Sequence, residues 1–127
     1  MRLIVVRHAE AAPGDPDELR PLTAAGRDAA RALGERLARE RIDVILTSPL
    51  LRARETAEAI AGTSRAPVEI DERLAPGATA AATKEAVSGR GETVVTVGHQ
   101  PDCSEIVLEL TGREQRFAPA GFAEVEL

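Results

Sequence analysis

The sequence predicts an α/β fold, with three layers (α/β/α) built around a mainly parallel central sheet. Short apolar runs alternate along the chain with amphipathic segments of helical length. Two of these runs lead into a proline-containing helix start, at Ser48-Pro49 and at Gln100-Pro101. Strands that alternate with helices are typical of a sheet covered by its crossover helices.

The N-terminal third begins with an apolar strand over residues 2–7. A polar loop from Glu10 to Arg20 follows, because Pro13 to Asp17 consist of turn-forming residue types. Thr23 is the expected N-cap of a helix over 24–40, in which apolar side chains recur at three- and four-residue spacing. This helix should cover one face of the sheet.

The middle of the chain repeats this pattern. Residues 42–47 form the next expected strand, after which Ser48 is a candidate N-cap with Pro49 at the first helical position. The helix should continue to about Ala61 and end at Gly62.

The C-terminal half has weaker signals between residues 71 and 92, where we expect mostly loop with one helical segment. The final strand should lie at the sheet edge and be antiparallel if it returns across the sheet. The expected elements are a strand at 68–70, a helical segment around 83–88, a strand at 93–97, a helix at 102–110 and a strand at 122–127.

Length and composition limit the function classes. With 127 residues, the chain fits one domain, 1–127, that buries roughly two-thirds of its unfolded surface. A net charge of -5 and the lack of Trp and Tyr argue against nucleic-acid binding. The N-terminal apolar stretch, Leu3 to Val6, is far shorter than the roughly 20 residues of a membrane span or a signal-peptide core. We therefore expect a cytoplasmic protein with no membrane or nucleic-acid partner.

The sequence gives no sign of a cofactor or metal. Cys103 is the single cysteine, so no internal disulfide forms, and two histidines add few ligands for zinc. His8-Ala9-Glu10 and Pro101-Asp102-Cys103 loosely resemble a zinc-deaminase pattern, but the second cysteine is missing. The glycines form neither a Walker A nor a dinucleotide motif, so a reaction without cofactor is expected.

The two histidines carry the main functional signal, since His8 and His99 each follow a predicted strand. Ligands of open α/β sheets bind beyond the carboxyl ends of the strands, so both imidazoles should lie in that crevice. A neutral imidazole can attack phosphorus and hold the phosphoryl group covalently. The guanidinium of Arg7 would both lower the pKa of His8 and bind phosphoryl oxygens.

A second strand-to-helix junction adds candidate phosphate ligands. Arg52 follows Ser48 by four residues, and helical side chains lean toward the helix N-terminus, so its guanidinium can reach the same crevice. Ser48 and the first helical amides should complete an anion site.

Each of these residues also has a purely structural interpretation. His8 and His99 could be capping or loop histidines, and Arg7 a charge at a strand end. Arg52 could be a solvated arginine paired with Glu55. Cys103 is better interpreted as a small buried packing residue than as a nucleophile. The convergence of four such residues on one sheet edge favours the functional interpretation.

The motifs resemble the histidine phosphatase superfamily, the phosphoglycerate-mutase-like group. Val6-Arg7-His8-Ala9-Glu10 is similar to its Arg-His-Gly-Glu motif, with Ala9 in place of the usual glycine. Three further segments resemble family segments in the expected order, and they are Arg20 to Arg27, Thr47 to Ala57, and Val97 to Pro101. The short length and the Arg-Pro-Leu-Thr segment are most similar to SixA-type phosphohistidine phosphatases.

The resemblance implies roles for particular residues. His8 would be the phosphorylated nucleophile, with Arg7, Arg52 and His99 as the rest of the phosphate pocket and Arg20 as an additional contact. The implied substrate is phosphohistidine on a signalling phosphotransfer domain. Glu72 is the candidate general acid in a stretch much shorter than the lid of the mutases, and a surface carboxylate is its structural alternative.

Two other functions remain open on the sequence. One is a phosphomonoesterase that acts on a small phosphorylated metabolite. The other is a catalytically weak module that binds phosphate or a phosphoprotein, because no general acid is evident.

Overall fold

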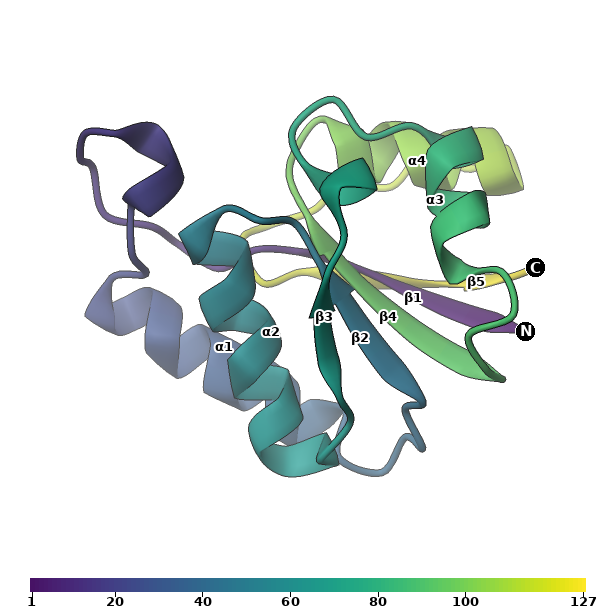
Figure 1. Cartoon of the computed structure of the whole chain (residues 1–127), viewed down its shortest axis with the longest axis horizontal. Helices are drawn as coiled ribbons and strands as arrows, with labels where there is room; N and C mark the ends of the chain where they lie inside the picture. Colours follow the sequence, from purple (N-terminus) through teal and green to yellow (C-terminus); the bar gives the residue numbers. More distant parts are fainter.

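The computed structural model describes residues 1–127 and contains one five-stranded sheet with helices on both faces (Figure 1). The strands are β1 (Arg2–Arg7), β2 (Val44–Thr47), β3 (Val68–Ile70), β4 (Thr93–Gly98) and β5 (Phe122–Glu126). The helices are α1 (Ala24–Arg36), α2 (Leu51–Ser64), α3 (Ala80–Val87) and α4 (Asp102–Thr111), with short 3-10 turns η1 (Asp17–Leu19) and η2 (Glu72–Leu74).

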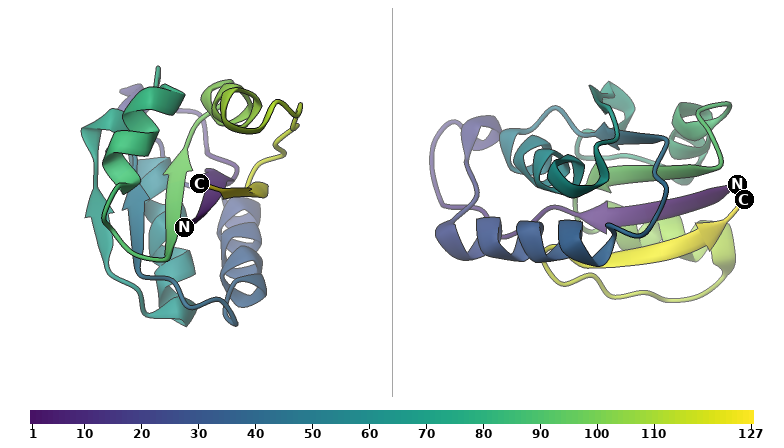
Figure 2. Two further views of the ribbon diagram at one scale, coloured as in Figure 1. Left: turned by 90° about the vertical axis from the view of Figure 1, so that its right-hand side faces the viewer. Right: turned by 90° about the horizontal axis from the view of Figure 1, so that it is seen from below.

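The sheet has the order β3-β2-β4-β1-β5. The first four strands are parallel, and β5 pairs with β1 in antiparallel orientation at the edge. Figure 2 shows β5 beside β1, with the two chain termini next to each other. The predicted α/β class, the mainly parallel sheet and the antiparallel C-terminal edge strand are confirmed.

Alternating side chains of the strands build two apolar layers. In β1, Ile4 and Val6 pack toward α1 and α2, whereas Leu3 and Val5 pack toward α3 and α4. All four side chains are buried. Because both sheet faces are covered, β1 is a continuous apolar run rather than an alternating one.

The chain path creates a switch point between β1 and β4, which are neighbours in the sheet. After β1 the chain crosses to α1 on one face, and after β4 it continues into α4 on the other face (Figure 1). Ligand crevices of open α/β sheets form where neighbouring strands diverge in this way. The residues that follow Arg7 and Gly98 therefore border the crevice.

A close approach between α1 and the loop after β1 requires glycine at position 26. A Cβ at Gly26 would lie 2.1 Å from the carbonyl oxygen of Glu10. The same carbonyl accepts a hydrogen bond from the backbone N–H of Thr23, the N-cap of α1. The start of α1 thus fixes the loop that leaves the crevice.

The boundaries of α1 and α2 differ from the expected ones. α1 ends at Arg36 rather than near 40, because the chain turns there while the Leu37 side chain stays buried in the core. α2 begins at Leu51, since Ser48 uses its Oγ to accept from the Leu50 N–H instead of capping a helix that starts at Pro49.

Helix α2 also continues through Gly62 and ends at Ser64. Arg65 is its C-cap and adopts the left-handed conformation, with φ of 60°. An interior glycine costs a helix about 1 kcal/mol, which packing on the core outweighs. The helical segment expected around 83–88 is α3 over 80–87. No helix is long and apolar enough to cross a membrane.

Candidate active site

Three strand ends are joined at the carboxyl edge of the sheet. The His8 N–H donates to the carbonyl of Gly98 at 3.0 Å, and the Ser48 N–H donates to the carbonyl of Val97 at 3.0 Å. Since β4 lies between β1 and β2, these bonds place His8, His99 and Ser48 side by side. The three junctions expected from the sequence therefore come together.

The two imidazoles face each other with ring centroids 5.2 Å apart and planes tilted by 59°. Nδ1 of His8 lies 2.7 Å from the carbonyl oxygen of Ala9. A carbonyl only accepts, so this contact assigns the hydrogen of a neutral His8 to Nδ1 and its lone pair to Nε2. Nε2 of His99 lies 2.7 Å from Oγ of Ser48, which positions the second ring.

Both histidines are held in the neutral form. Burial is the largest cause that lowers the pKa of His8, and the charges of Arg52, Arg7 and Arg20 lower it further against the opposing effect of the Ala9 carbonyl. Burial also lowers the pKa of His99 to about 4, with smaller contributions from His8 and Arg52. Near neutral pH each ring therefore keeps one nitrogen lone pair.

Two arginines from different elements belong to the site, Arg7 at the end of β1 and Arg52 in the first turn of α2. NH1 of Arg7 donates to the carbonyl of Phe117 at 2.8 Å, while its Nε is buried without a hydrogen-bond partner. Arg52 is only 7% exposed. A guanidinium is always charged, so its burial beside a neutral histidine makes a strong anion site.

Asp17, the first residue of η1, binds two arginines, Arg52 and Arg20. Its carboxylate Oδ2 lies 3.1 Å from NH2 of Arg52, and its Oδ1 lies 2.9 Å from NH1 of Arg20. The carbonyl of Asp17 also accepts from NH1 of Arg52 at 2.9 Å. Hydrogen bonds from Arg20 and Arg52 hold the pKa of Asp17 below its usual value. This contact was not predicted, because Asp17 and Arg52 are 35 residues apart in the chain.

Two residues of α2 anchor the loop that carries His8. Oγ1 of Thr56 accepts from the buried Ala9 N–H at 3.0 Å and donates to the Arg52 carbonyl at 2.8 Å. Glu55 accepts from the Leu22 N–H at 2.8 Å, so it is not the partner of Arg52 that the structural interpretation required. Thr56 was not singled out from the sequence, and Glu55 was considered only as a partner of Arg52, since the residues they bind are far away in the chain.

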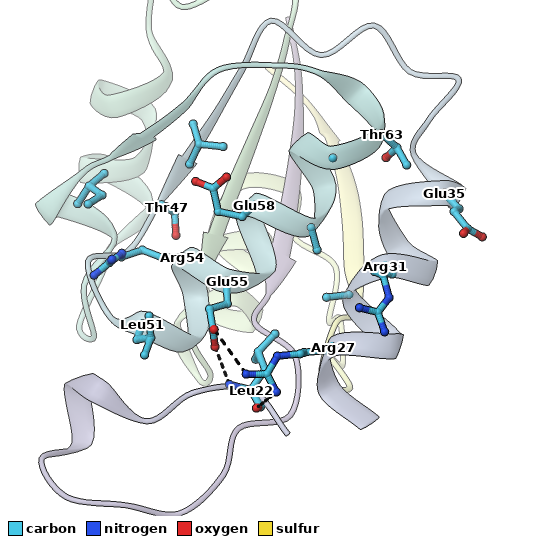
Figure 3. Close-up of a pocket in the computed structure, with 15 residues that line it drawn as sticks. Leu22, Arg27, Arg31, Glu35, Thr47, Leu51, Arg54, Glu55, Glu58 and Thr63 are labelled. Carbon is cyan, nitrogen blue, oxygen red and sulfur yellow. Dashed lines mark hydrogen bonds and ion pairs between the residues drawn. The ribbon is translucent and has the colours of Figure 1, made fainter. Parts of the chain in front are cut away.

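Glu55 also borders an open groove of about 830 Å³ along α2 (Figure 3). The dashed lines in Figure 3 mark the contacts of Glu55 with Leu22 and with Arg27, whose ion-pair distance is 3.7 Å. Neither histidine lines this groove. The groove is therefore separate from the histidine site.

The remaining candidates lie outside the histidine cluster. Glu72 is exposed on η2 and makes no side-chain hydrogen bond. Cys103 is buried in the core, and burial raises the pKa of its thiol to about 12, which fits the packing role expected of it. No group of three His, Cys, Asp or Glu side chains is placed to hold a metal ion.

Two neutral imidazoles, the buried guanidinium of Arg52 and the half-buried Arg7 lie at the carboxyl edge of an α/β sheet, an arrangement typical of phosphate-handling enzymes. The chain belongs to the histidine phosphatase superfamily, because the sequence model of branch 1 of that superfamily matches residues 3–78. The expectation from the motifs is thus confirmed.

Within the superfamily, the chain is similar to particular proteins of known sequence or structure. The chain is 29% identical to the phosphohistidine phosphatase SixA of Escherichia coli (strain K12), over 100% of this chain and 86% of that protein. It is 36% identical to an uncharacterized protein of Picosynechococcus sp., over 95% of this chain and 82% of the relative. The structure of SixA complexed with tungstate matches with a TM-score of 0.90 and 28% identity, covering 100% of this chain and 88% of that one. The protein is a SixA-like phosphatase of this superfamily.

Proposed function

We propose that this protein removes phosphate from phosphohistidine on a cytoplasmic signalling phosphotransfer protein, through a phosphohistidine intermediate at His8 and without a metal. The observation that carries the proposal is the hydrogen bond between Nδ1 of His8 and the carbonyl of Ala9. It directs the lone pair to Nε2, and the lowered pKa of His8 keeps that nitrogen unprotonated. Nε2 is therefore the nucleophile.

In the first step, Nε2 of His8 forms a bond to phosphorus while the bond to the leaving group breaks. Nδ1 keeps its hydrogen, so phospho-His8 is an imidazolium whose charge the Ala9 carbonyl stabilises. In the second step, water attacks phosphorus and His8 leaves as a neutral imidazole. The proton of the water goes to the released inorganic phosphate, and the free enzyme is restored.

Three other side chains stabilise the phosphoryl group during transfer. The guanidinium groups of Arg7 and Arg52 bind its equatorial oxygens. One of these oxygens would accept a hydrogen bond from the buried Nε–H of Arg7, which has no partner in the protein. If the Ser48 hydroxyl donates to Nε2 of His99, the neutral His99 ring carries its hydrogen on Nδ1, which has no protein acceptor. That N–H is then available to a phosphoryl oxygen, and Ser48 acts by orienting His99. Arg20 adds positive charge to the pocket.

The choice of substrate rests on leaving-group chemistry and on similarity to SixA. A protonated phosphohistidine releases a neutral imidazole, so it needs little help from a general acid. A phosphate ester with a poor leaving group does need an acid, and Glu72 is our candidate for it. Its position on exposed η2 leaves it in contact with solvent rather than fixed in the pocket.

The test compares the wild type with His8→Gln on a phosphohistidine-bearing phosphotransfer domain and on an aryl phosphate, each with EDTA. We expect release of phosphate from the phosphoprotein that requires His8 and resists the chelator. Quenching in alkaline detergent should trap on the wild type alone a phosphoryl group that is stable in base and released by acid.

Other outcomes would change the assignment. A preference for the aryl ester would favour a small-molecule phosphomonoesterase. Binding of phosphate without turnover of either substrate would favour a binding module. Loss of activity in EDTA that added metal restores would contradict the metal-free mechanism.

A further inference from the structure

The loop after β1 places a carboxylate directly on the arginines of the phosphate pocket. Asp17 gives Arg52 two acceptors, its side-chain Oδ2 at 3.1 Å and its own carbonyl at 2.9 Å. Both terminal nitrogens of Arg52 are therefore engaged by one residue. The other carboxylate oxygen binds Arg20 at 2.9 Å.

The two partners differ sharply in exposure. The Arg52 side chain is 9% exposed, whereas the Asp17 side chain is 59% exposed. The arginine is thus fixed in the protein, and the carboxylate lies at the solvent-facing side of the contact. A rotation of the Asp17 side chain would free NH2 of Arg52 and leave NH1 on the backbone carbonyl.

A carboxylate and a phosphoryl group use the same guanidinium donors. Arg52 lies close enough to His8 for its charge to lower the pKa of that ring, and the charge of Asp17 reaches His99. The Asp17 carboxylate therefore lies within the electrostatic field of the site, where an incoming phosphoryl group requires the same NH2.

We propose that Asp17 is a positioning residue of the phosphate pocket that acts as an internal anion. It holds Arg52 in place between turnovers, leaves NH2 of Arg52 when a phosphoryl group binds, and competes with inorganic phosphate for return to it. This inference rests on the proposed function, because it assumes that Arg52 binds the phosphoryl group. Competition of this kind weakens binding of the product and limits product inhibition.

The experiment measures the Kd of inorganic phosphate by calorimetry at fixed ionic strength and pH 7.5, without turnover. The variants are Asp17→Asn, which keeps the side-chain shape and loses the charge, and Asp17→Ala, which also removes the side-chain acceptors and keeps the backbone carbonyl. Glu18→Gln is the matched control, because Glu18 is in the same turn, is exposed and makes no side-chain hydrogen bond. It changes the net charge by the same amount.

We expect both Asp17 variants to bind phosphate about threefold to fivefold more tightly, since no carboxylate then competes with the anion for NH2 of Arg52. Glu18→Gln should stay within error of the wild type. In kinetic assays the inhibition constant of phosphate should fall by the same factor in the Asp17 variants. A residue that only supports the loop would not improve binding of an anion.

Weaker or unchanged phosphate binding in both Asp17 variants would overturn the inference. An equal gain in Glu18→Gln would also overturn it, because the effect would then come from net charge. A further variant, Arg52→Gln, distinguishes an error in the role of Asp17 from an error in the proposed phosphate pocket. If the wild type binds phosphate and Arg52→Gln does not, the pocket stands whatever the Asp17 variants show. If phosphate binding does not depend on Arg52, both proposals fail.

Discussion

The buried, neutral His99 should make this fold sensitive to mild acid. His99 is 4% exposed, and its pKa in the folded state is about 4, compared with 6.5 in an unfolded chain. Between these values the unfolded chain binds a proton that the folded protein does not, so stability falls as the pH is lowered. At 1.36 kcal/mol per pKa unit, His99 alone removes about 2 kcal/mol of unfolding free energy by pH 5 and about 3 kcal/mol by pH 4.

The measurement is urea unfolding followed by far-UV circular dichroism at several pH values from 7.5 to 4, because the chain has no Trp or Tyr for fluorescence. His99→Gln is the comparison, since glutamine can still bond to Ser48 and does not titrate. The variant can be less stable at every pH, and only the pH dependence matters.

We expect the unfolding free energy of the wild type to fall more steeply below pH 6.5 than that of His99→Gln. The variant should keep part of the acid sensitivity, because it still contains His8, whose pKa is also lowered in the folded protein. Parallel curves for the two proteins over this range would refute the assignment of a buried, neutral His99.

Two further predictions concern the loop anchor and the general acid. Thr56→Val leaves the buried Ala9 N–H unpaired, so we expect a loss of about 1–3 kcal/mol of stability and a lower kcat. The control is Thr63→Val on the same helix, whose hydroxyl bonds to Gly34 away from the histidines, and it should reduce stability with kcat unchanged. Equal kcat values in the two variants would argue against Thr56 as an anchor of the His8 loop. Glu72→Gln should slow hydrolysis of an alkyl phosphate about tenfold or more while hardly changing that of phosphohistidine or an aryl phosphate, if Glu72 is the acid; an unchanged alkyl rate would assign Glu72 to the surface.

Local sequence predicted the elements well where one signal dominated. β1 is built around a continuous apolar run and β4 around three valines, and Thr23 caps α1 as expected, with its Oγ1 accepting from the Gly26 N–H. The predictions failed where packing outweighed a local preference. Gly62 does not end α2, because the helix packs on the core at Ile60 and continues through Thr63 to Ser64.

The candidate site was predictable for a related reason. His8, Ser48 and His99 follow strands, and the carboxyl ends of parallel strands meet at one sheet edge whatever the details of packing. Arg52 was expected at the crevice because it follows Ser48 by four residues near the start of a helix, although that helix begins only at Leu51. Its acceptor does not follow, because Asp17 is 35 residues earlier, at the start of the short turn η1.

The sequence by itself therefore determined the sheet, the edge at which the histidines lie, and the family. Only the tertiary structure decided how those residues are held: the Phe117 carbonyl on Arg7, Thr56 on the Ala9 N–H, and Asp17 on Arg52. These contacts join positions from 35 to 110 residues apart. Periodicity and capping signals act within a few residues, so they fix elements and strand ends, whereas pairings between distant loops exist only once the layers have packed.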